Sequence, residues 1–308
     1  INQHYISDKI PAVSLSGGID SNLITNHLIK SKKKLTSFTL GFENQSYNEA
    51  EYVKNSFKNL DKKIFQTKQS DFEDNFKELS KFLNEPFGDS SIVPTYIIQK
   101  KIKKFSNVSL GGDGGDETFF GYIVFDAFYL ALKLKKLLPP FLFKSISKIV
   151  NLLRNSDDYL PISTRLKKFF NTLHYKHEYL LPSWMGSITL KDFKKFFNED
   201  IQVQEIYKDV ESLFDNEKNL MRISQLYFFK FYLPMILIKV DQASMYNSVE
   251  SRAPFLSKRI INFSLNNDTS YLYKPFKKKY FLKNVFKNEL SSKVFSRKKH
   301  GFAFPRQK

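Results

Sequence analysis

The sequence predicts an α/β protein: a doubly wound parallel sheet followed by a largely helical C-terminal part. Through residue 122, short β-rich runs alternate with segments whose apolar residues recur at helical spacing. Two of the β-rich runs end directly in glycine-rich loops. Residues 123–290 show helical periodicity and almost no alternating strands. Alternation of strands and helices at this spacing is typical of a parallel sheet covered by helices.

The individual elements of the first part follow from these periodicities. Strands are expected at residues 12–15, 35–40, 63–67 and 107–110. Helices are expected around residues 23–28, over 48–60 and 71–83, and in the second part of 92–105. The sequence therefore predicts an α/β core over residues 1–122 and a helical extension over residues 123–308.

Composition narrows the class of protein. The 308 residues are 42% hydrophobic and include 32 Phe, which excludes a disordered chain because such a chain lacks apolar area to bury. There is no cysteine, which excludes disulfides, thiolate metal sites and cysteine nucleophiles. Lys and Arg number 49 against 31 Asp and Glu, a net charge of +18, so nucleic acid or an anionic surface enters as a candidate partner.

The positive charge is concentrated near the C-terminal end. Residues 271–308 contain ten Lys, two Arg and one acidic residue. Cations that would face a phosphate fall in this stretch, as argued below, so part of the charge has a local use. Nucleic acid is therefore kept only as a minor alternative.

The start of the chain and its most apolar stretch bear on localisation. The first residue is Ile1, and no apolar run follows a basic start, so we expect a processed chain or a fragment without a signal peptide. Residues 223–240 are the most apolar, and Lys230, Pro234 and Lys239 interrupt them. Buried helices explain this stretch better than a membrane span. We expect a cytoplasmic protein with no membrane partner.

The first glycine-rich loop reads Ser-Gly-Gly-Ile-Asp-Ser over residues 16–21, between a strand and a helix. Its glycines let the backbone approach an anion and tolerate a positive φ. The helix behind it offers free N–H groups and the positive end of its dipole. The hydroxyls of Ser16 and Ser21 add donors, and Asp20 can hold Mg²⁺. A plain strand-to-helix turn is the alternative, and no Gly-Lys-Ser/Thr follows to make a Walker A motif.

The second glycine-rich loop reads Gly-Gly-Asp-Gly-Gly-Asp-Glu over residues 111–117 and follows the strand at 107–110. The carboxyl ends of parallel strands meet at the ligand-binding edge of a sheet, so both loops are expected at that edge. Acids among glycines suit Mg²⁺, which takes one or two carboxylates together with phosphate oxygens. A calcium-type or purely structural loop is the alternative.

Together these motifs resemble known families. The first loop resembles the pyrophosphate loop of the N-type ATP pyrophosphatases, which split ATP between the α- and β-phosphates. The second loop, with the Phe-Phe-Gly-Tyr that follows it, resembles a signature of the C-terminal synthetase domain of glutamine-hydrolysing asparagine synthetases. Other segments resemble that family in the same order along nearly the whole chain: residues 84–91, 239–245, 249–256, 279–283 and 297–302.

The resemblance implies an adenine nucleotide α-hydrolase (HUP-like) fold and a ligase of class EC 6.3.5.4 that uses ATP and Mg²⁺. In this family ATP and L-aspartate give β-aspartyl-AMP and pyrophosphate, and ammonia then displaces AMP to give L-asparagine. The ammonia comes from glutamine through an N-terminal glutaminase domain with a nucleophilic Cys. That domain has no counterpart in this chain, so we expect the chain alone to use free ammonia. A homodimer is a further expectation.

The resemblance also assigns roles to individual residues. The pyrophosphate loop corresponds to Ser16, Gly17, Gly18, Asp20 and Ser21. Contacts to the adenine nucleotide correspond to Leu15, Leu40, Gly111 and Gly112. The positions that hold Mg²⁺ correspond to Asp20 and Asp116. Asp113 matches the acid linked to forming the adenylate and deprotonating ammonia, and Lys279 matches the lysine that neutralises the α-phosphate and pyrophosphate.

Some assignments have competing interpretations. Lys279 is one of three adjacent lysines, and most lysines are solvated. Glu250 and Arg252 fit a structural ion pair as well as a substrate role. Residues 297–299 fit either a mobile basic loop over the site or plain surface.

The chain also departs from the family pattern, and related enzymes remain alternatives. Gly111 replaces the usual Ser and leaves only a backbone N–H, while Lys283 replaces an Arg with which it is not interchangeable at a bidentate site. Related enzymes amidate sugar acids of surface polysaccharides or close a β-lactam ring. tRNA-lysidine synthetase shares the first loop but not the second. A non-enzymatic anion-binding module would not need both Asp20 and Asp116.

Overall fold

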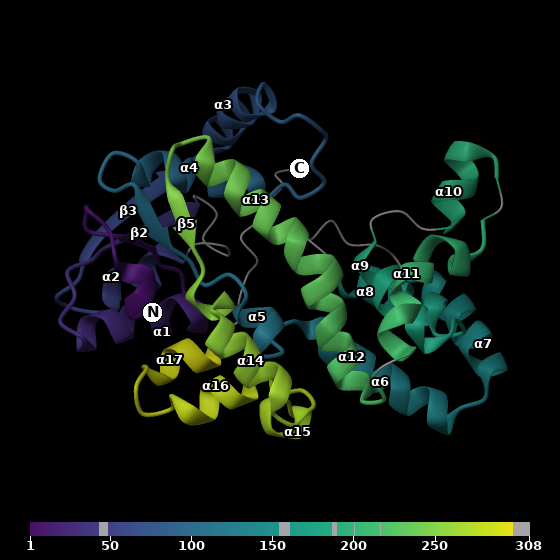
Figure 1. The fold of residues 1–308 in the computed structure, drawn as a ribbon. Coiled ribbons are helices and arrows are strands. Elements are labelled where there is room, and N and C mark those ends of the chain that lie inside the picture. The colour runs from purple at the N-terminus through teal and green to yellow at the C-terminus, as the bar shows by residue number, and fades with distance from the viewer. Residues whose placement is uncertain (43–48, 154–160, 187–189, 200, 216, 298–308) are drawn as a thin grey trace. The chain divides into compact units, whose positions relative to one another are not determined.

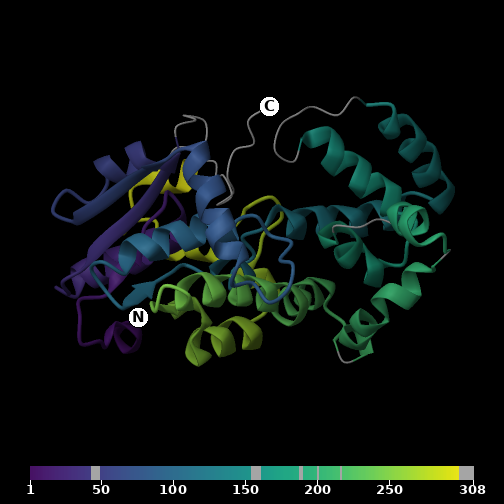
Figure 2. The same cartoon turned by 90° about the horizontal axis from the view of Figure 1, so that it is seen from above.

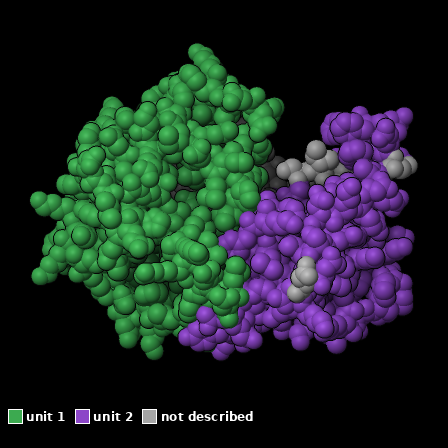
Figure 3. Space-filling view, in the orientation of Figure 1, with its two compact units in different colours: residues 1–119, 233–266, 279–308 green, residues 120–232, 267–278 purple. Residues whose placement is uncertain are grey.

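A computed structural model describes residues 1–42, 49–153, 161–186, 190–199, 201–215 and 217–297. The chain divides into two compact units (Figure 3). Unit 1 comprises residues 1–119, 233–266 and 279–308, and unit 2 comprises residues 120–232 and 267–278. Each unit is therefore built from segments that are separated in the sequence.

Unit 1 contains a five-stranded sheet in which every neighbouring pair is parallel. Its strands are β1 (Ala12–Ser14), β2 (Thr36–Phe42), β3 (Asp61–Thr67), β4 (Val108–Leu110) and β5 (Glu250–Arg252). The order across the sheet is β3-β2-β1-β4-β5. The central strand β1 pairs with both β2 and β4, with Val13 opposite Ser37 and Leu110. The predicted parallel α/β sheet is confirmed.

Helices and short 3₁₀ turns surround this sheet (Figures 1 and 2). They are η1 (Asn2–Tyr5), α1 (Ile19–Lys30), α2 (Ala50–Asn55), α3 (Gln69–Ser80), α4 (Ile92–Ile102), α5 (Gly115–Thr118), α13 (Leu233–Met245), η5 (Pro254–Leu256), α14 (Lys258–Asn266), α16 (Tyr280–Val285) and α17 (Ser292–Ser296). A core cluster joins Ala12 and Phe38 of the sheet to Tyr96 of α4. Val13 points to the opposite face by strand alternation and is also fully buried, so both faces of the sheet are covered.

The fifth strand comes from a part of the sequence that was expected to be helical. Residues 250–252 add β5 to the edge of the sheet, with Ser251 opposite Ser109. Its sequence, Glu-Ser-Arg, has no apolar alternation, because an edge strand of three residues does not need to bury a face. Segments 233–266 and 279–297, which the sequence grouped with the helical extension, also pack within unit 1.

The described elements of unit 2 are helical. They are α6 (Ile123–Leu137), α7 (Pro140–Asn151), α8 (Ile162–Thr172), η3 (His177–Tyr179), α9 (Leu180–Met185), α10 (Leu190–Phe197), α11 (Val203–Asp215), α12 (Leu220–Tyr227), η4 (Phe228–Tyr232) and α15 (Thr269–Leu272). Aromatic rings fill the core: the Phe125 ring lies 4.8 Å from that of Phe120 and 4.7 Å from that of Phe228. The Asp126 carboxylate accepts a hydrogen bond from the Tyr273 hydroxyl at 2.9 Å and so ties residues 267–278 to α6.

One helical run of the described residues, Leu220–Met245, is long and apolar enough to cross a membrane by length and composition. It includes the π-helical turn η4, and 39% of its most apolar window is buried inside the protein. Core helices of soluble proteins satisfy the same test, so this run is weak evidence for a membrane span.

Candidate functional site

The first glycine-rich loop joins β1 to α1, and two of its N–H groups donate to serine hydroxyls of the loop itself. The N–H of Ser16 donates to the Ser21 hydroxyl at 3.1 Å, and the N–H of Gly18 donates to the Ser16 hydroxyl at 3.1 Å. Gly18 does not use the positive φ that glycine tolerates: its φ is −80°, because it is the extended N-cap residue of α1. The N–H of Gly17 donates to Glu49 Oε2 at 2.9 Å, so a carboxylate occupies a donor of this loop.

Asn22, which was not among the predicted site residues, holds the first loop in place through hydrogen bonds to its backbone. Its side chain is fully buried, and Nδ2 donates to the carbonyls of Ser16 at 2.8 Å and Gly18 at 2.7 Å. Its Oδ1 accepts a hydrogen bond from the Tyr52 hydroxyl at 3.1 Å. The signal in the sequence is a polar residue at a buried position of a helix immediately after a loop.

The second glycine-rich loop lies against the first. Gly115 begins α5, and a Cβ on it would lie 2.6 Å from Asp20 Oδ1. A side chain here would therefore collide with the carboxylate that follows the first loop. Gly114 has a φ of +84°, and a Cβ on it would lie 2.2 Å from Leu256 Cδ2. Gly115 thus lets the two loops approach each other at the carboxyl edge of the sheet, and Gly114 lets the second loop approach η5.

Lys279 forms ion pairs with one acid of each glycine-rich loop. Its Nζ forms ion pairs with Asp20 Oδ2 and, at 2.6 Å, with Asp116 Oδ1. The exposed fractions of the three side chains are only 6% for Lys279, 8% for Asp20 and 11% for Asp116. Lys277 and Lys278 are exposed, so burial distinguishes Lys279 from its neighbours.

Local packing holds Lys279 in this position. It is the N-cap residue of α16 and has a φ of +52°, an unusual conformation for a residue with a side chain. The Phe281 ring of α16 stacks on Phe119, with ring centroids 5.5 Å apart and planes at 7°. Because Phe119 directly follows α5, this stack places the start of α16 beside the second loop.

The donor set fits Mg²⁺ held jointly with a phosphate. Asp20 Oδ1 is buried and has no hydrogen-bond partner, so it is a carboxylate oxygen available to a cation. Among the described residues there is no group of three or more His, Cys, Asp and Glu that could hold a metal. Two carboxylates, Asp20 and Asp116, match the preference of Mg²⁺ for one or two carboxylates completed by phosphate oxygens and waters. They do not form an all-protein metal cage.

The predicted nucleotide-contacting residues lie next to the loops, with much of their backbone already paired. The N–H of Leu15 donates to the Phe38 carbonyl at 2.9 Å, and the Leu15 carbonyl accepts from the Thr39 hydroxyl at 2.7 Å. Leu40 is buried in β2. The N–H of Gly111 donates to the Arg252 carbonyl at 2.9 Å, so in this structure β5 uses the backbone donor that remains at this position.

Gly112 and Asp113, the next two residues of the second loop, are half-buried. Gly112 contacts Asp20, since a Cβ on Gly112 would lie 2.8 Å from that of Asp20. Asp113 lies beside Gly111: a Cβ on Gly111 would be 2.7 Å from Asp113 Oδ2. The structure therefore brings Asp20, Asp116 and Lys279 together and places Asp113 on the turn that precedes them.

A basic residue from the C-terminal segment lies over the first loop. A Cβ on Gly17 would be 3.1 Å from Arg297 Nε, and the Arg297 guanidinium lies 5.1 Å from the centre of the Tyr52 ring. Burial raises the pKa of Tyr52, an effect that the Arg297 charge opposes. Lys298 and Lys299, the rest of the predicted basic loop, lie outside the described residues.

An ion pair joins two further segments that the sequence had singled out. Lys239 Nζ lies 3.0 Å from Asp89 Oδ2 and 2.9 Å from the Ser91 hydroxyl. Burial by itself would raise the pKa of Asp89, but the Lys239 charge and the hydrogen bonds from Ser91 outweigh it and hold that pKa below its usual value. The contact fixes residues 84–91 against α13 within unit 1.

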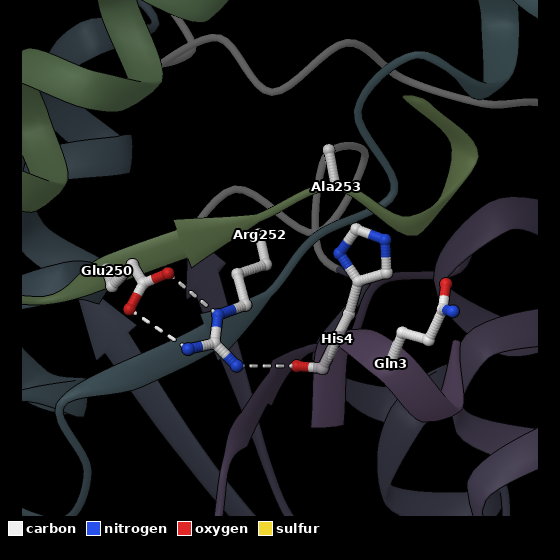
Figure 4. Close-up of a pocket in the computed structure, with 5 residues that line it drawn as sticks. All are labelled: Gln3, His4, Glu250, Arg252 and Ala253. Atoms are coloured by element: carbon white, nitrogen blue, oxygen red, sulfur yellow. Dashed lines mark hydrogen bonds and ion pairs between the residues drawn. The ribbon is translucent and has the colours of Figure 1, made fainter. Parts of the chain in front are cut away.

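Glu250 and Arg252 form the structural ion pair that was one of their two interpretations. Arg252 Nε lies 2.8 Å from Glu250 Oε1, and Nη1 donates to the His4 carbonyl at 2.9 Å (Figure 4). Hydrogen bonding from Arg252 lowers the pKa of Glu250. A shallow surface pocket opens here, lined by Gln3, His4, Glu250, Arg252 and Ala253. Its lining does not include Asp20, Asp116 or Lys279, so the pocket is separate from the group of buried charges described above.

Comparison with known proteins shows a family match over the whole chain. The family model described as asparagine synthase matches residues 1–308. The glutamine-hydrolysing asparagine synthetase 1 of Bacillus subtilis (strain 168) is 27% identical over 322 residues, covering 99% of this chain and 48% of that protein. A Mycobacterium tuberculosis (strain H37Rv) protein provisionally named a glutamine-hydrolysing asparagine synthetase is 26% identical, covering 99% of this chain and 46% of that protein.

A third relative comes from Methanocaldococcus jannaschii and is provisionally named glutamine-hydrolysing asparagine synthetase 2. It is 30% identical over 257 residues, covering 78% of this chain and 46% of that protein. The chain thus spans about half the length of the curated relatives it matches.

Proposed function

Because the chain belongs to the asparagine synthase family, we propose that it activates the side-chain carboxylate of L-aspartate with ATP and transfers ammonia to it. The products are L-asparagine, AMP and pyrophosphate. In the first step an aspartate carboxylate oxygen attacks the α-phosphorus of ATP, the bond between the α-phosphorus and the bridging oxygen breaks, and pyrophosphate leaves. In the second step ammonia attacks the acyl carbon of β-aspartyl-AMP, loses a proton, and AMP leaves.

The observation that carries this proposal is the buried contact of Lys279 with both Asp20 and Asp116. Among these three side chains, one ammonium faces two carboxylates, so one negative charge is in excess and a further cation is favoured. Adenylation builds negative charge on phosphate oxygens, which a buried lysine at the junction of two phosphate-facing loops can neutralise. Mg²⁺ held by Asp20 and Asp116 would supply further charge neutralisation of the phosphates.

The resemblance to the asparagine synthetases gives the remaining residues their proposed roles. The loop of residues 16–21 would bind the pyrophosphate, with the N–H groups of Ser16, Gly17 and Gly18 exchanging their present side-chain partners for phosphate oxygens. Leu15, Leu40, Gly111 and Gly112 would line the adenine nucleotide. Asp113 is half-buried on the adjoining turn, where its carboxylate could accept the proton that ammonia loses.

Exchange of radiolabelled pyrophosphate into ATP tests the first step. We expect exchange that depends on both L-aspartate and Mg²⁺, and Asp116→Ala should abolish it while far-ultraviolet circular dichroism stays native. Asp74→Ala, a change on α3 of unit 1, is the matched control and should retain exchange. Exchange that requires a sugar acid or tRNA in place of aspartate would refute the assignment of substrate.

The source of ammonia is tested separately. We propose that the chain works with a glutaminase domain of the kind that the names of its relatives imply, as in class EC 6.3.5.4. The 308-residue chain should then form asparagine from ammonium salts and not from glutamine. Asparagine formed from glutamine by this chain alone would contradict that division of labour.

A further inference from the structure

Helix α7 of unit 2 presents apolar side chains to solvent along one side. Phe141 and Ile149 of α7 are 66% and 67% exposed, Leu152, which directly follows the helix, is 83% exposed, and the next residue, Leu153, is also exposed. Their spacing of eight and three residues puts the first three on one face of the helix. The opposite face holds Phe143, which is 2% exposed, so the helix is already anchored without these side chains. Their exposure therefore serves no packing within the described part of unit 2.

Exposed apolar side chains also occur on α6 and α8, the helices that precede and follow α7 in the chain. Leu137 at the end of α6 is 76% exposed, and Ile162 at the start of α8 is 73% exposed. Helices α7 and α8 pack together, with the Ser147 hydroxyl donating to Asn171 Oδ1 at 2.5 Å. Monomeric soluble proteins rarely leave so many large apolar side chains exposed in one region, and such exposure marks an interaction surface.

The charge of the same helices has one sign. Helices α6, α7 and α8 carry eight cationic side chains: Lys133, Lys135, Lys136, Lys144, Lys148, Arg165, Lys167 and Lys168. Their one acidic residue, Asp126, is buried and accepts a hydrogen bond from Tyr273. Lys144 and Lys148 are exposed between the apolar residues of α7. The partner must therefore accept apolar side chains and supply negative charge.

These requirements select among partners. A second copy of the chain would bring like charges together across a symmetric interface, which is unfavourable. Single-stranded nucleic acid is held by aromatic stacking, whereas most of the exposed apolar groups here are aliphatic. An anionic bilayer accepts aliphatic side chains at the boundary between headgroups and acyl chains and attracts lysines to its surface.

We propose that α7 is an interfacial membrane-binding helix that docks on anionic lipid through Phe141, Lys144, Lys148, Ile149, Leu152 and Leu153. These six residues are the α7 face. The mode is binding in the plane of the bilayer surface, not a membrane span. It departs from the sequence expectation of no membrane partner, because sequence alone did not show which apolar side chains stay exposed. It also accounts for part of the net charge of +18.

Vesicle flotation tests the proposal. The 308-residue chain should float with vesicles of phosphatidylcholine and phosphatidylglycerol roughly tenfold better than with phosphatidylcholine alone, and salt should weaken this binding. The double variants Phe141→Ser/Leu152→Ser and Lys144→Glu/Lys148→Glu should each lose it. Phe76→Ser is the matched control: Phe76 is 51% exposed on α3, a helix with four acidic residues, and its removal should leave flotation unchanged.

The outcomes separate the alternatives. Thermal melting by circular dichroism should be the same for the variants and the parent, because the changed side chains are exposed. Equal flotation of parent and variants overturns the proposal, as does flotation that ignores lipid charge. It is also overturned if the chain does not float and the same substitutions instead abolish binding to RNA or dissociate a dimer in analytical ultracentrifugation.

Discussion

The Lys279 ammonium lies 2.6 Å from Oδ1 of Asp116, with both side chains buried. The same ammonium also pairs with Asp20, although the two acids follow different strands of the sheet. Lys279, from the C-terminal part of the sequence, thus pairs with one acid from each of the two glycine-rich loops. In the state described here, Lys279 holds together the groups that we propose bind Mg²⁺ and phosphate.

Replacing Lys279 by Met should separate its structural and chemical contributions. Removal of the ammonium leaves two buried carboxylates without their shared cation, and we expect unfolding to become easier by about 3 kcal/mol. Mg²⁺ should raise the melting temperature of the variant more than that of the parent, because the metal takes over neutralisation of the acids. Aspartate-dependent exchange should fall on the order of 100-fold.

Lys278→Met is the control for Lys279→Met, since Lys278 is an exposed neighbour. It should leave both the melting temperature and the exchange rate near those of the parent. An equal response of parent and Lys279→Met to Mg²⁺ would argue against a metal site at the two acids.

Substitution of Gly115 by Ala should damage the junction of the two loops. The new Cβ would lie 2.6 Å from Asp20 Oδ1, so either the loop or the carboxylate must move. We expect a loss of about 1–3 kcal/mol in the free energy of unfolding and weaker pyrophosphate exchange. Gly88→Ala is the control, because a Cβ there meets nothing within 4 Å. Urea denaturation of both variants measures the difference, and equal effects would show that the close approach of Asp20 is unimportant.

Asn22→Ala should loosen the first loop without touching a ligand directly. The carbonyls of Ser16 and Gly18 would lose their buried donor, at a cost of about 2 kcal/mol in stability. The apparent affinity for ATP should fall as the loop loses its brace, which equilibrium dialysis measures. Asn26→Ala, one turn further along α1 and partly exposed, should change neither quantity. Unaltered ATP affinity in Asn22→Ala would rule out a positioning role.

The Lys239–Asp89 pair should make stability depend on pH. The folded-state pKa of Asp89 is below its usual value, so its contribution is present above that usual value and is lost as the pH falls through the lowered pKa. Lys239→Met should therefore cost about 2 kcal/mol at neutral pH and progressively less in acid. Urea denaturation at several pH values checks this, and a cost that is constant with pH would contradict it.

Much of the sheet could be predicted because its inner strands are buried on both faces. Such strands read as short apolar runs, and the predicted strands at 12–15, 35–40 and 107–110 overlap the inner strands β1, β2 and β4, while the one at 63–67 overlaps the edge strand β3. Residues 250–252 escaped because this three-residue strand, Glu-Ser-Arg, has no apolar residue, whereas the other edge strand, β3, contains Ile64 and Phe65.

For the site, sheet topology explains why residues after two different strands could be expected to meet. The structure brings Asp20 and Asp116 together, as that topology requires. Glu49 could not be found, because its hydrogen bond to the Gly17 N–H leaves no mark in the spacing of residues, whereas a polar residue at a buried helix position was a usable signal for Asn22. Burial distinguished Lys279 from two adjacent lysines, and burial is a property of the folded chain.

The late position of β5 in the sequence has a consequence for biosynthesis. The edge of β4 has no strand partner on that side until residues 250–252 emerge from the ribosome, after all of residues 120–232. Open strand edges pair with other chains, and pairing between distant segments is slow. Nascent chains that stall before residue 250 would therefore expose this edge and aggregate, which makes rapid synthesis or chaperone protection important for yield.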